Sequence, residues 1–272
     1  MKKEFILYSL AIGINRGATL LYLPFLTYSL SLADYGLYSY IQVLFQVLFP
    51  ILCFNIPSGI AREGADSPTK GLFLYQKAIP YVIVIIAVSS FLAFFVEKIF
   101  SIEWLLVIFL LAGVEALHNM QLSIYRAFDK HIIYLTFVAV KTIGLGLIIS
   151  VLINYGHMSL MAVLISQVSW YVVVFAIFRI SKTIKVNAGT IERLDFKPVI
   201  IFSLLLIPHI ISQWAMSAVN RIFVKNIVGN EAMGLYSISY SLAMAILLIN
   251  SGIAIVLPQN FIRNPEYWLK TN

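Results

Sequence analysis

The chain has 272 residues, of which 61% are apolar and 11% are charged, and its formal net charge is +7. About a quarter of the residues of a soluble domain are charged, so this composition excludes a soluble domain and predicts a protein of the lipid bilayer. The single cysteine, Cys53, excludes an internal disulfide, and the absence of paired Cys and His spacings argues against a metal site; no cofactor is expected. The chain has no basic run or polar domain, so we attribute its positive charge to cytoplasmic loops of a membrane protein and expect no nucleic-acid binding.

Eight apolar stretches are each long enough to cross a bilayer as a helix of about 20 residues. They lie near residues 5–29, 37–61, 78–96, 104–125, 132–153, 159–179, 199–220 and 233–257. Strands of a β-barrel would be shorter and would alternate in polarity, so the sequence predicts an all-α, polytopic transmembrane helix bundle. The two longest connections, near 62–77 and 180–198, are polar and are predicted to be loops outside the hydrocarbon.

The basic residues predict the orientation of the bundle, because lysine and arginine accumulate in cytoplasmic loops. With eight alternating spans, one side of the membrane receives Lys2, Lys3, Arg62, Lys70, Lys77, Arg126, Lys130, Arg179, Lys182, Lys185, Arg193 and Lys197. The other side receives Lys98, Arg221 and Lys225. We therefore expect a cytoplasmic N-terminus. Arg16 interrupts the first apolar stretch and no signal-peptide cleavage motif follows, so this stretch is read as a retained helix.

A short motif occurs twice, as YGLYSY at 35–40 and as MGLYSI at 233–238, which is 198 positions later. Both copies join the end of one span to the start of the next, and the even number of spans between them gives both the same orientation. This pattern is typical of the parallel repeats of transporters, although a chance match in an apolar sequence is the alternative. The repeat predicts a six-helix bundle at 1–180, a cytoplasmic linker at 181–197, and the first two helices of an incomplete second bundle at 198–272.

Four ionisable residues fall near the predicted middle of their spans: Arg16, Glu115, Lys141 and His209. A charged group at this depth costs about 2.5–3.5 kcal/mol on insertion scales, which makes each one a candidate functional residue. In one interpretation, Glu115 pairs with Arg16 or Lys141 only to neutralise a buried base. In the other, these groups line a water-filled cavity of net positive character that suits a phosphate-bearing substrate.

Further polar candidates lie on the same predicted spans as Glu115 and His209. His118 follows Glu115 by three positions, and Asn119 follows it by four, so all three share one helical face. Arg221 and Lys225 lie at the outer end of the seventh span, where they fit either an outer mouth of the cavity or an approach to the membrane interface. His209 is equally compatible with a hydrogen bond to a neighbouring helix.

Catalytic signatures are absent from the sequence. No loop is large enough to fold as a catalytic domain, and neither a P-loop nor a G-x-S-x-G motif is present. We therefore expect no enzyme activity and no catalytic residues, which leaves a secondary transporter.

The segments FLTYSLSLADYGLYSYIQVLFQV at 25–47 and VNRIFVKNIVGNEAMGLYSISYSLAMAI at 219–246 resemble motifs of Wzx-type polysaccharide flippases. These proteins belong to the multidrug/oligosaccharidyl-lipid/polysaccharide exporter superfamily. The resemblance implies two six-helix bundles that face each other in a V, whereas this chain offers only eight spans. It also implies a substrate, an undecaprenyl-diphosphate-linked oligosaccharide that is flipped from the inner to the outer leaflet for O-antigen or capsule biosynthesis.

The resemblance also implies a location, partners and a site. The location is the bacterial inner membrane, and the partners are the lipid-linked oligosaccharide, membrane lipids and polysaccharide polymerase or assembly proteins. Cationic residues line the cavity of such flippases, a role that Arg16 and Lys141 match by depth. The complete set of expected substrate-binding residues is Arg16, Glu115, His118, Lys141, His209, Arg221 and Lys225.

Three alternatives remain open. A cation-coupled multidrug exporter of the same fold should bury more acids than bases, the reverse of the balance here. A polytopic glycan polymerase or ligase would normally carry a large outer loop, which this sequence lacks. A non-functional fragment would be indicated if the reading frame beyond residue 272 encoded further apolar spans.

Overall fold

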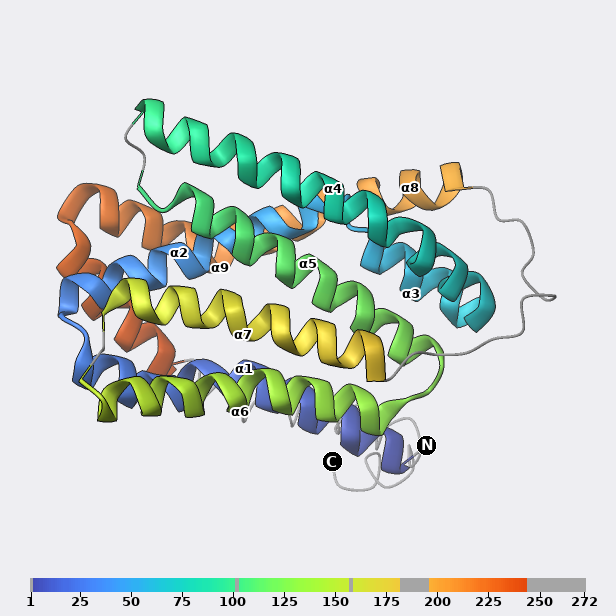
Figure 1. The fold of residues 1–272 in the computed structure, drawn as a ribbon, viewed down its shortest axis with the longest axis horizontal. Helices are drawn as coiled ribbons and strands as arrows, with labels where there is room; N and C mark the ends of the chain where they lie inside the picture. Colours follow the sequence, from blue (N-terminus) through green and yellow to red (C-terminus); the bar gives the residue numbers. More distant parts are fainter. Residues whose placement is uncertain (1, 101–102, 157–158, 182–195, 244–272) are drawn as a thin grey trace, which may run out of the picture.

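The computed structural model describes residues 2–100, 103–156, 159–181 and 196–243, and its regular elements in these ranges are helices (Figure 1). They are α1 (Lys2–Ser29), α2 (Leu32–Leu52), α3 (Ile56–Asp66), α4 (Pro68–Phe100), α5 (Leu105–Ala127), α6 (His131–Asn154), α7 (Leu160–Ser181), α8 (Phe196–Leu205) and α9 (Ile207–Val228). Residues 230–243 form a further stretch of helix. The described part of the chain contains no strand, which confirms the predicted all-α fold.

Within the described ranges, six helical segments are long and apolar enough to cross a membrane: α2, α4, α5, α6, α7 and the stretch 196–228 that combines α8 and α9. Helix α1 takes the place of the first expected span, and residues 230–243 are the described part of the eighth. Many outward-facing side chains are large and apolar, among them Tyr81, Leu147 and Ile180. So much exposed apolar surface fits lipid and not water, so the chain is a polytopic membrane bundle.

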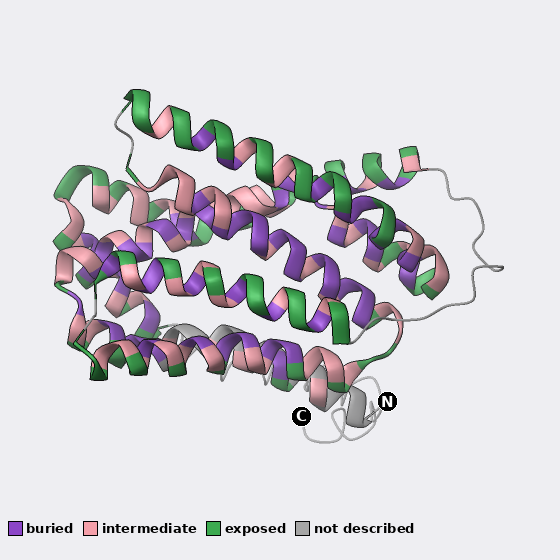
Figure 2. Cartoon of the chain, in the orientation of Figure 1, coloured by how far each residue is buried: buried purple, intermediate pink, exposed green. Residues whose placement is uncertain are grey.

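Helix α5 lies at the centre of the bundle (Figure 1). It packs between α4 on one side and α7 on the other, and α6 and α1 lie side by side beyond α7. Purple buried residues run along most of α5, whereas α4 is largely exposed (Figure 2). The mid-length position of Glu115 on α5 therefore brings a carboxylate to the interior of the bundle.

Two boundaries differ from the sequence prediction. The expected span at 37–61 ends early, at Leu52, because Phe54 and Asn55 adopt positive φ and α3 begins at Ile56. The region near 62–77 was expected to be a polar loop, and this expectation is wrong: α3 continues to Asp66 and α4 begins at Pro68. Proline is favoured in the first turn of a helix, which explains the immediate restart.

The expected span at 199–220 consists of two helices that meet at Leu206. Pro208 lies in the first turn of α9 and has no N–H to continue the hydrogen-bond ladder of α8. Helix α8 packs on α3, where the Asn55 side-chain amide donates to the carbonyl oxygen of Ser203 over 3.2 Å. Residues 182–195, which form most of the expected linker, lie outside the described residues.

The two copies of the sequence repeat contact each other. Gly36 is the fifth residue of α2 and Gly234 is the fifth residue of the helix at 230–243, so the two glycines hold the same position in their helices. A Cβ at Gly36 would collide with the carbonyl oxygen of Asn230, and a Cβ at Gly234 with that of Leu32. Neither glycine lies in the turn before its helix, and each lets the two helices approach closely.

One hydrogen bond continues this contact between the two copies. The Ser39 and Ser237 hydroxyls, which are equivalent in the repeat, lie 2.8 Å apart and are both buried. The two helices therefore meet through residues that hold the same positions in the two copies of the motif.

Candidate functional site

A cavity of about 580 Å³ lies between α1, α2, α5, α6, α7, α9 and the helix at 230–243. One face of α2 lines it, because Tyr35, Tyr38, Ser39, Gln42 and Gln46 recur at intervals of three or four residues. This spacing places polar groups along the inner side of a helix whose remaining residues are mostly apolar. The volume lies within the usual range for small-molecule sites.

Helix α9 lines the opposite wall through residues with the same helical spacing. Gln213, Trp214, Ser217 and Arg221 face the cavity, and the Trp214 indole N–H donates to the carbonyl oxygen of Val43 on α2 over 2.9 Å. That bond ties the two walls together at one point. The cavity therefore lies between the first six-helix region and the start of the predicted second bundle.

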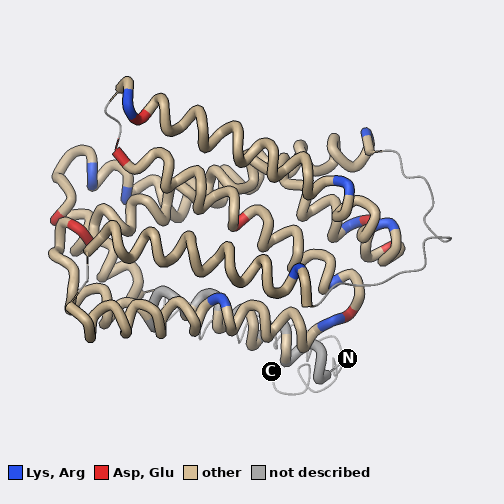
Figure 3. The backbone as a smooth tube through the Cα atoms, in the orientation of Figure 1, with Lys and Arg blue, Asp and Glu red and all other residues tan. Residues whose placement is uncertain are grey.

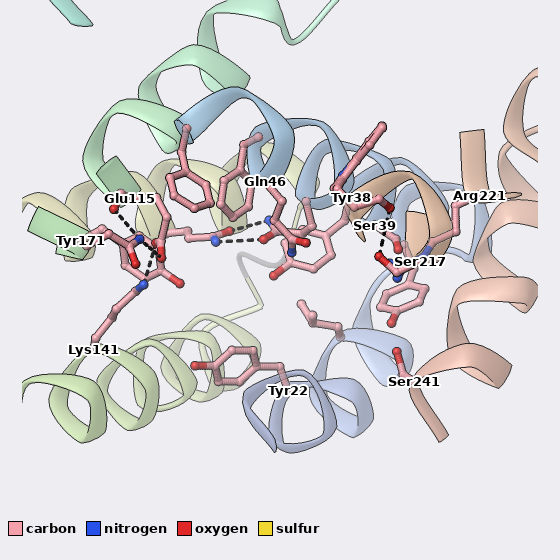
Figure 4. A pocket seen from close by; sticks show the side chains of 18 of the residues that line it. Tyr22, Tyr38, Ser39, Gln46, Glu115, Lys141, Tyr171, Ser217, Arg221 and Ser241 are labelled. Carbon is pink, nitrogen blue, oxygen red and sulfur yellow. Dashed lines mark hydrogen bonds and ion pairs between the residues drawn. The ribbon is translucent and has the colours of Figure 1, made fainter. Parts of the chain in front are cut away.

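Lys141 and Glu115 form an ion pair on the cavity wall, shown on the left of Figure 4. The Lys141 Nζ atom lies 2.6 Å from Glu115 Oε2, and the two side chains are only 8% and 18% exposed. The Asn119 amide donates to Glu115 Oε1 over 3.2 Å, and Lys141 Nζ lies 4.6 Å from the ring centre of Tyr171. Of the two bases proposed from the sequence as partners for Glu115, the structure shows Lys141 in that role.

His118 does not line the cavity, although it shares a helical face with Glu115. Its side chain is fully buried, and its Nε2–H donates to the carbonyl oxygen of Tyr171 over 2.8 Å. The Phe137 ring packs edge-on against it, with 5.1 Å between ring centres. His118 Nδ1 lies 3.9 Å from Glu115 Oε2, so the histidine lies behind the ion pair and supports it.

Arg221 lines the cavity at the side away from the ion pair, shown on the right of Figure 4. Its guanidinium lies over the ring of Tyr240, 4.3 Å from the ring centre. Its Nε atom is buried without a hydrogen-bond partner, and among the described residues no carboxylate pairs with it. Of the two interpretations left open for Arg221, the cavity position is the one observed.

The remaining predicted residues lie elsewhere. Lys225 is one turn beyond Arg221 but lies over the ring of Tyr40, 3.9 Å from its centre, beside a separate cavity of about 260 Å³. His209 is exposed, and its Nε2 lies 3.0 Å from the Gln213 amide of the same helix rather than near another helix. Arg16 belongs to α1, but its side chain lies outside the described residues.

Apart from Asn119, the uncharged residues of the site were not anticipated. Gln42 and Gln167 exchange two side-chain hydrogen bonds, of 2.9 and 3.2 Å, between α2 and α7. Tyr22, Tyr38 and Trp214 contribute aromatic surface to the same cavity. The sequence analysis considered only ionisable groups and therefore missed the amides. Gln42 and Gln46 are four residues apart in an apolar span, and this spacing predicts a polar face on that helix.

The fold and this site define a polytopic helical membrane protein with a polar cavity in its interior. The chain matches the family described as "Polysaccharide biosynthesis protein" over residues 1–258, so it belongs to that family. This confirms the family that the sequence motifs indicated.

A solved structure described as "protein A" shares the fold, with a TM-score of 0.66 and 13% sequence identity. The match covers 91% of this chain and 61% of that one, so the chain spans about three fifths of the length of the solved structure. A comparison with curated proteins gives no match.

Proposed function

We propose that this protein flips a lipid-linked oligosaccharide, of the undecaprenyl-diphosphate class, from the inner to the outer leaflet of the bacterial inner membrane. The N-terminus is cytoplasmic in this proposal, and the chain acts as a transporter and not as an enzyme. Polymerase or assembly proteins would use the flipped product for O-antigen or capsule synthesis. Membership of a polysaccharide biosynthesis family supports the proposal.

The observation that carries the proposal is Arg221, a cavity-lining cation that has no carboxylate partner among the described residues. Lys141 and Glu115 neutralise each other, so Arg221 leaves the described lining with one excess positive charge. Its Nε donor is buried and free. A guanidinium binds phosphate oxygens through charge-assisted hydrogen bonds and matches their geometry better than an ammonium does.

The polarity of the cavity supports the same substrate class. A glycan diphosphate head group cannot cross hydrocarbon without losing its hydrogen bonds to water, at a cost of several kcal/mol for each polar group. The serine, tyrosine and glutamine side chains of α2 and α9 offer replacement partners along the cavity. A cation-coupled drug exporter would need free carboxylates here, and the one described carboxylate of the lining, Glu115, is already paired.

The test is restoration of surface polysaccharide in a bacterial strain that lacks its own flippase, with protein abundance measured alongside. We expect the wild-type chain to restore surface glycan, Arg221→Ala to abolish most of it, and Arg221→Lys to retain part of it. Losing a charge-assisted hydrogen bond of about 1.5–3 kcal/mol weakens binding about 10- to 100-fold. Lys98→Ala, at the exposed end of α4, is the matched control and should behave as wild type.

Two outcomes would contradict the proposal. The first is a wild-type chain that reaches normal abundance and restores no surface glycan. The second is full restoration by Arg221→Ala at normal abundance, because that result would show that the free cation is not needed.

A further inference from the structure

We propose that Gln42 and Gln46 form a glycan-binding subsite of this cavity and that Gln167 positions the Gln42 amide. This inference rests on the proposed function, because it assumes that the cavity binds the sugar-diphosphate head group of a lipid-linked oligosaccharide and assigns each part of that head group its own contacts. The sugar contacts the amides, and the diphosphate contacts Arg221.

The first argument is the geometry of the amide pair. The Gln42 Nε2 donates to Gln167 Oε1 over 2.9 Å, and the Gln167 Nε2 donates back to Gln42 Oε1 over 3.2 Å. Gln167 is only 2% exposed, whereas Gln42 is half-buried and faces the cavity. The reciprocal bonds fix the plane of the Gln42 amide and leave it one N–H and one carbonyl lone pair for a ligand.

The second argument is the chemistry of these groups. A sugar hydroxyl both donates and accepts hydrogen bonds, and an amide side chain offers one group of each kind. Gln46 adds a second amide one turn along the same face of α2. Neutral amides carry no charge to attract a diphosphate. The Gln42 and Gln46 side chains therefore suit the uncharged sugar part of the head group.

The third argument is position. In Figure 4, Gln46 and Tyr38 lie between the Lys141–Glu115 pair on one side and Arg221 on the other. A head group whose phosphate contacts Arg221 would therefore extend its sugars along the amides toward the ion pair. Tyr38 and Trp214 add aromatic surface on which the apolar face of a sugar ring can pack.

A purely structural role makes a different prediction. If the pair only joins α2 to α7, its loss should loosen the whole cavity and weaken every ligand equally. If it forms a glycan subsite, its loss should remove only the affinity that the sugar adds. Two ligands that differ only in the sugar therefore separate the two roles.

The experiment is calorimetric binding to the purified full chain in lipid nanodiscs, with farnesyl diphosphate and with farnesyl diphosphate carrying an N-acetylglucosamine disaccharide. We expect the wild type to bind the glycosylated probe more tightly than the bare one. Gln42→Leu and Gln167→Leu should each reduce that advantage about 3- to 10-fold, the range expected for losing a neutral hydrogen bond. Affinity for bare farnesyl diphosphate should stay within twofold of wild type.

Gln121→Leu is the matched control, because Gln121 is a buried amide of α5 that bonds to Tyr125 and does not line the cavity. It should leave the ratio of the two affinities unchanged. Equal binding of both probes by the wild type would overturn the inference, as would a Gln42→Leu variant that keeps the full sugar advantage or loses both affinities together. Failure of the wild type to bind either probe would instead contradict the proposed function.

Discussion

Lys141 and Glu115 show how single residues shape this site. Each lies near the middle of a largely apolar helix, and they meet at 2.6 Å across the α5–α6 boundary. The sequence identified both residues, because a charge inside a spanning helix is conspicuous, but it could not choose between Arg16 and Lys141 as the partner of Glu115. That choice depends on how the helices rotate and pack, which hydropathy does not encode. Gln42 and Gln167 were missed for a related reason, since their partnership exists only after α2 and α7 meet.

We predict that removing one member of the ion pair destabilises the protein more than removing both. Glu115→Gln and Lys141→Met should each lower stability by about 3–5 kcal/mol, because each leaves a buried charge without its partner. The double variant should recover most of that loss. Thermal unfolding in detergent measures the effect, and Lys98→Met, at an exposed position, serves as the control. A double variant no more stable than the worse single variant would contradict this explanation.

At the scale of helices, the contact between α2 and the helix at 230–243 shows what a repeat can and cannot predict. The shared G-L-Y-S letters align Gly36 with Gly234, and in the structure each glycine is the fifth residue of its helix. The repeat did not reveal why glycine is needed at these positions. In the structure the two helices cross so closely that a Cβ on either glycine would collide with backbone atoms of the other copy. Helix ends were also hard to predict near Cys53, where apolar residues continue through the break between α2 and α3.

We predict that Gly36→Ala destabilises the bundle by about 1–3 kcal/mol, the usual cost of overpacking, because the added methyl group meets the backbone of Asn230. Gly13→Ala is the matched control, since a Cβ there meets no described atom within 4 Å. In a helix interior that substitution should be neutral or should stabilise by up to about 1 kcal/mol. Thermal unfolding of the two variants side by side measures the difference. Equal stability of both would show that the close approach of the helices does not exist.

At the scale of the whole molecule, the two ends of the bundle differ in charge. Figure 3 shows most of the blue segments at the end where α3 meets α4 and α5 meets α6. The ends of the helices that meet there carry Arg62, Lys70, Arg126 and Lys130. Lys98 and Lys225 lie in the last turns of α4 and α9, and Lys225 and Glu103 line the same cavity. The sequence anticipated this separation because helices that alternate in direction sort their loops to two sides. The order of the helices within the bundle was not predictable, since any apolar face can pack against any other.

The last prediction concerns which end faces the cytoplasm. Cytoplasmic loops are enriched in lysine and arginine, so the basic end should lie inside the cell and the turn before α2 outside it. We expect Ser31→Cys, at the exposed start of α2, to react with a membrane-impermeant thiol reagent in intact cells. Asp129→Cys, exposed between α5 and α6, should react only after the cells are opened. The native Cys53 is buried and bonded to the Phe49 carbonyl oxygen, so the wild-type chain should stay unlabelled and is the control. Labelling of Asp129→Cys but not Ser31→Cys in intact cells would reverse the topology, and with it the direction proposed for transport.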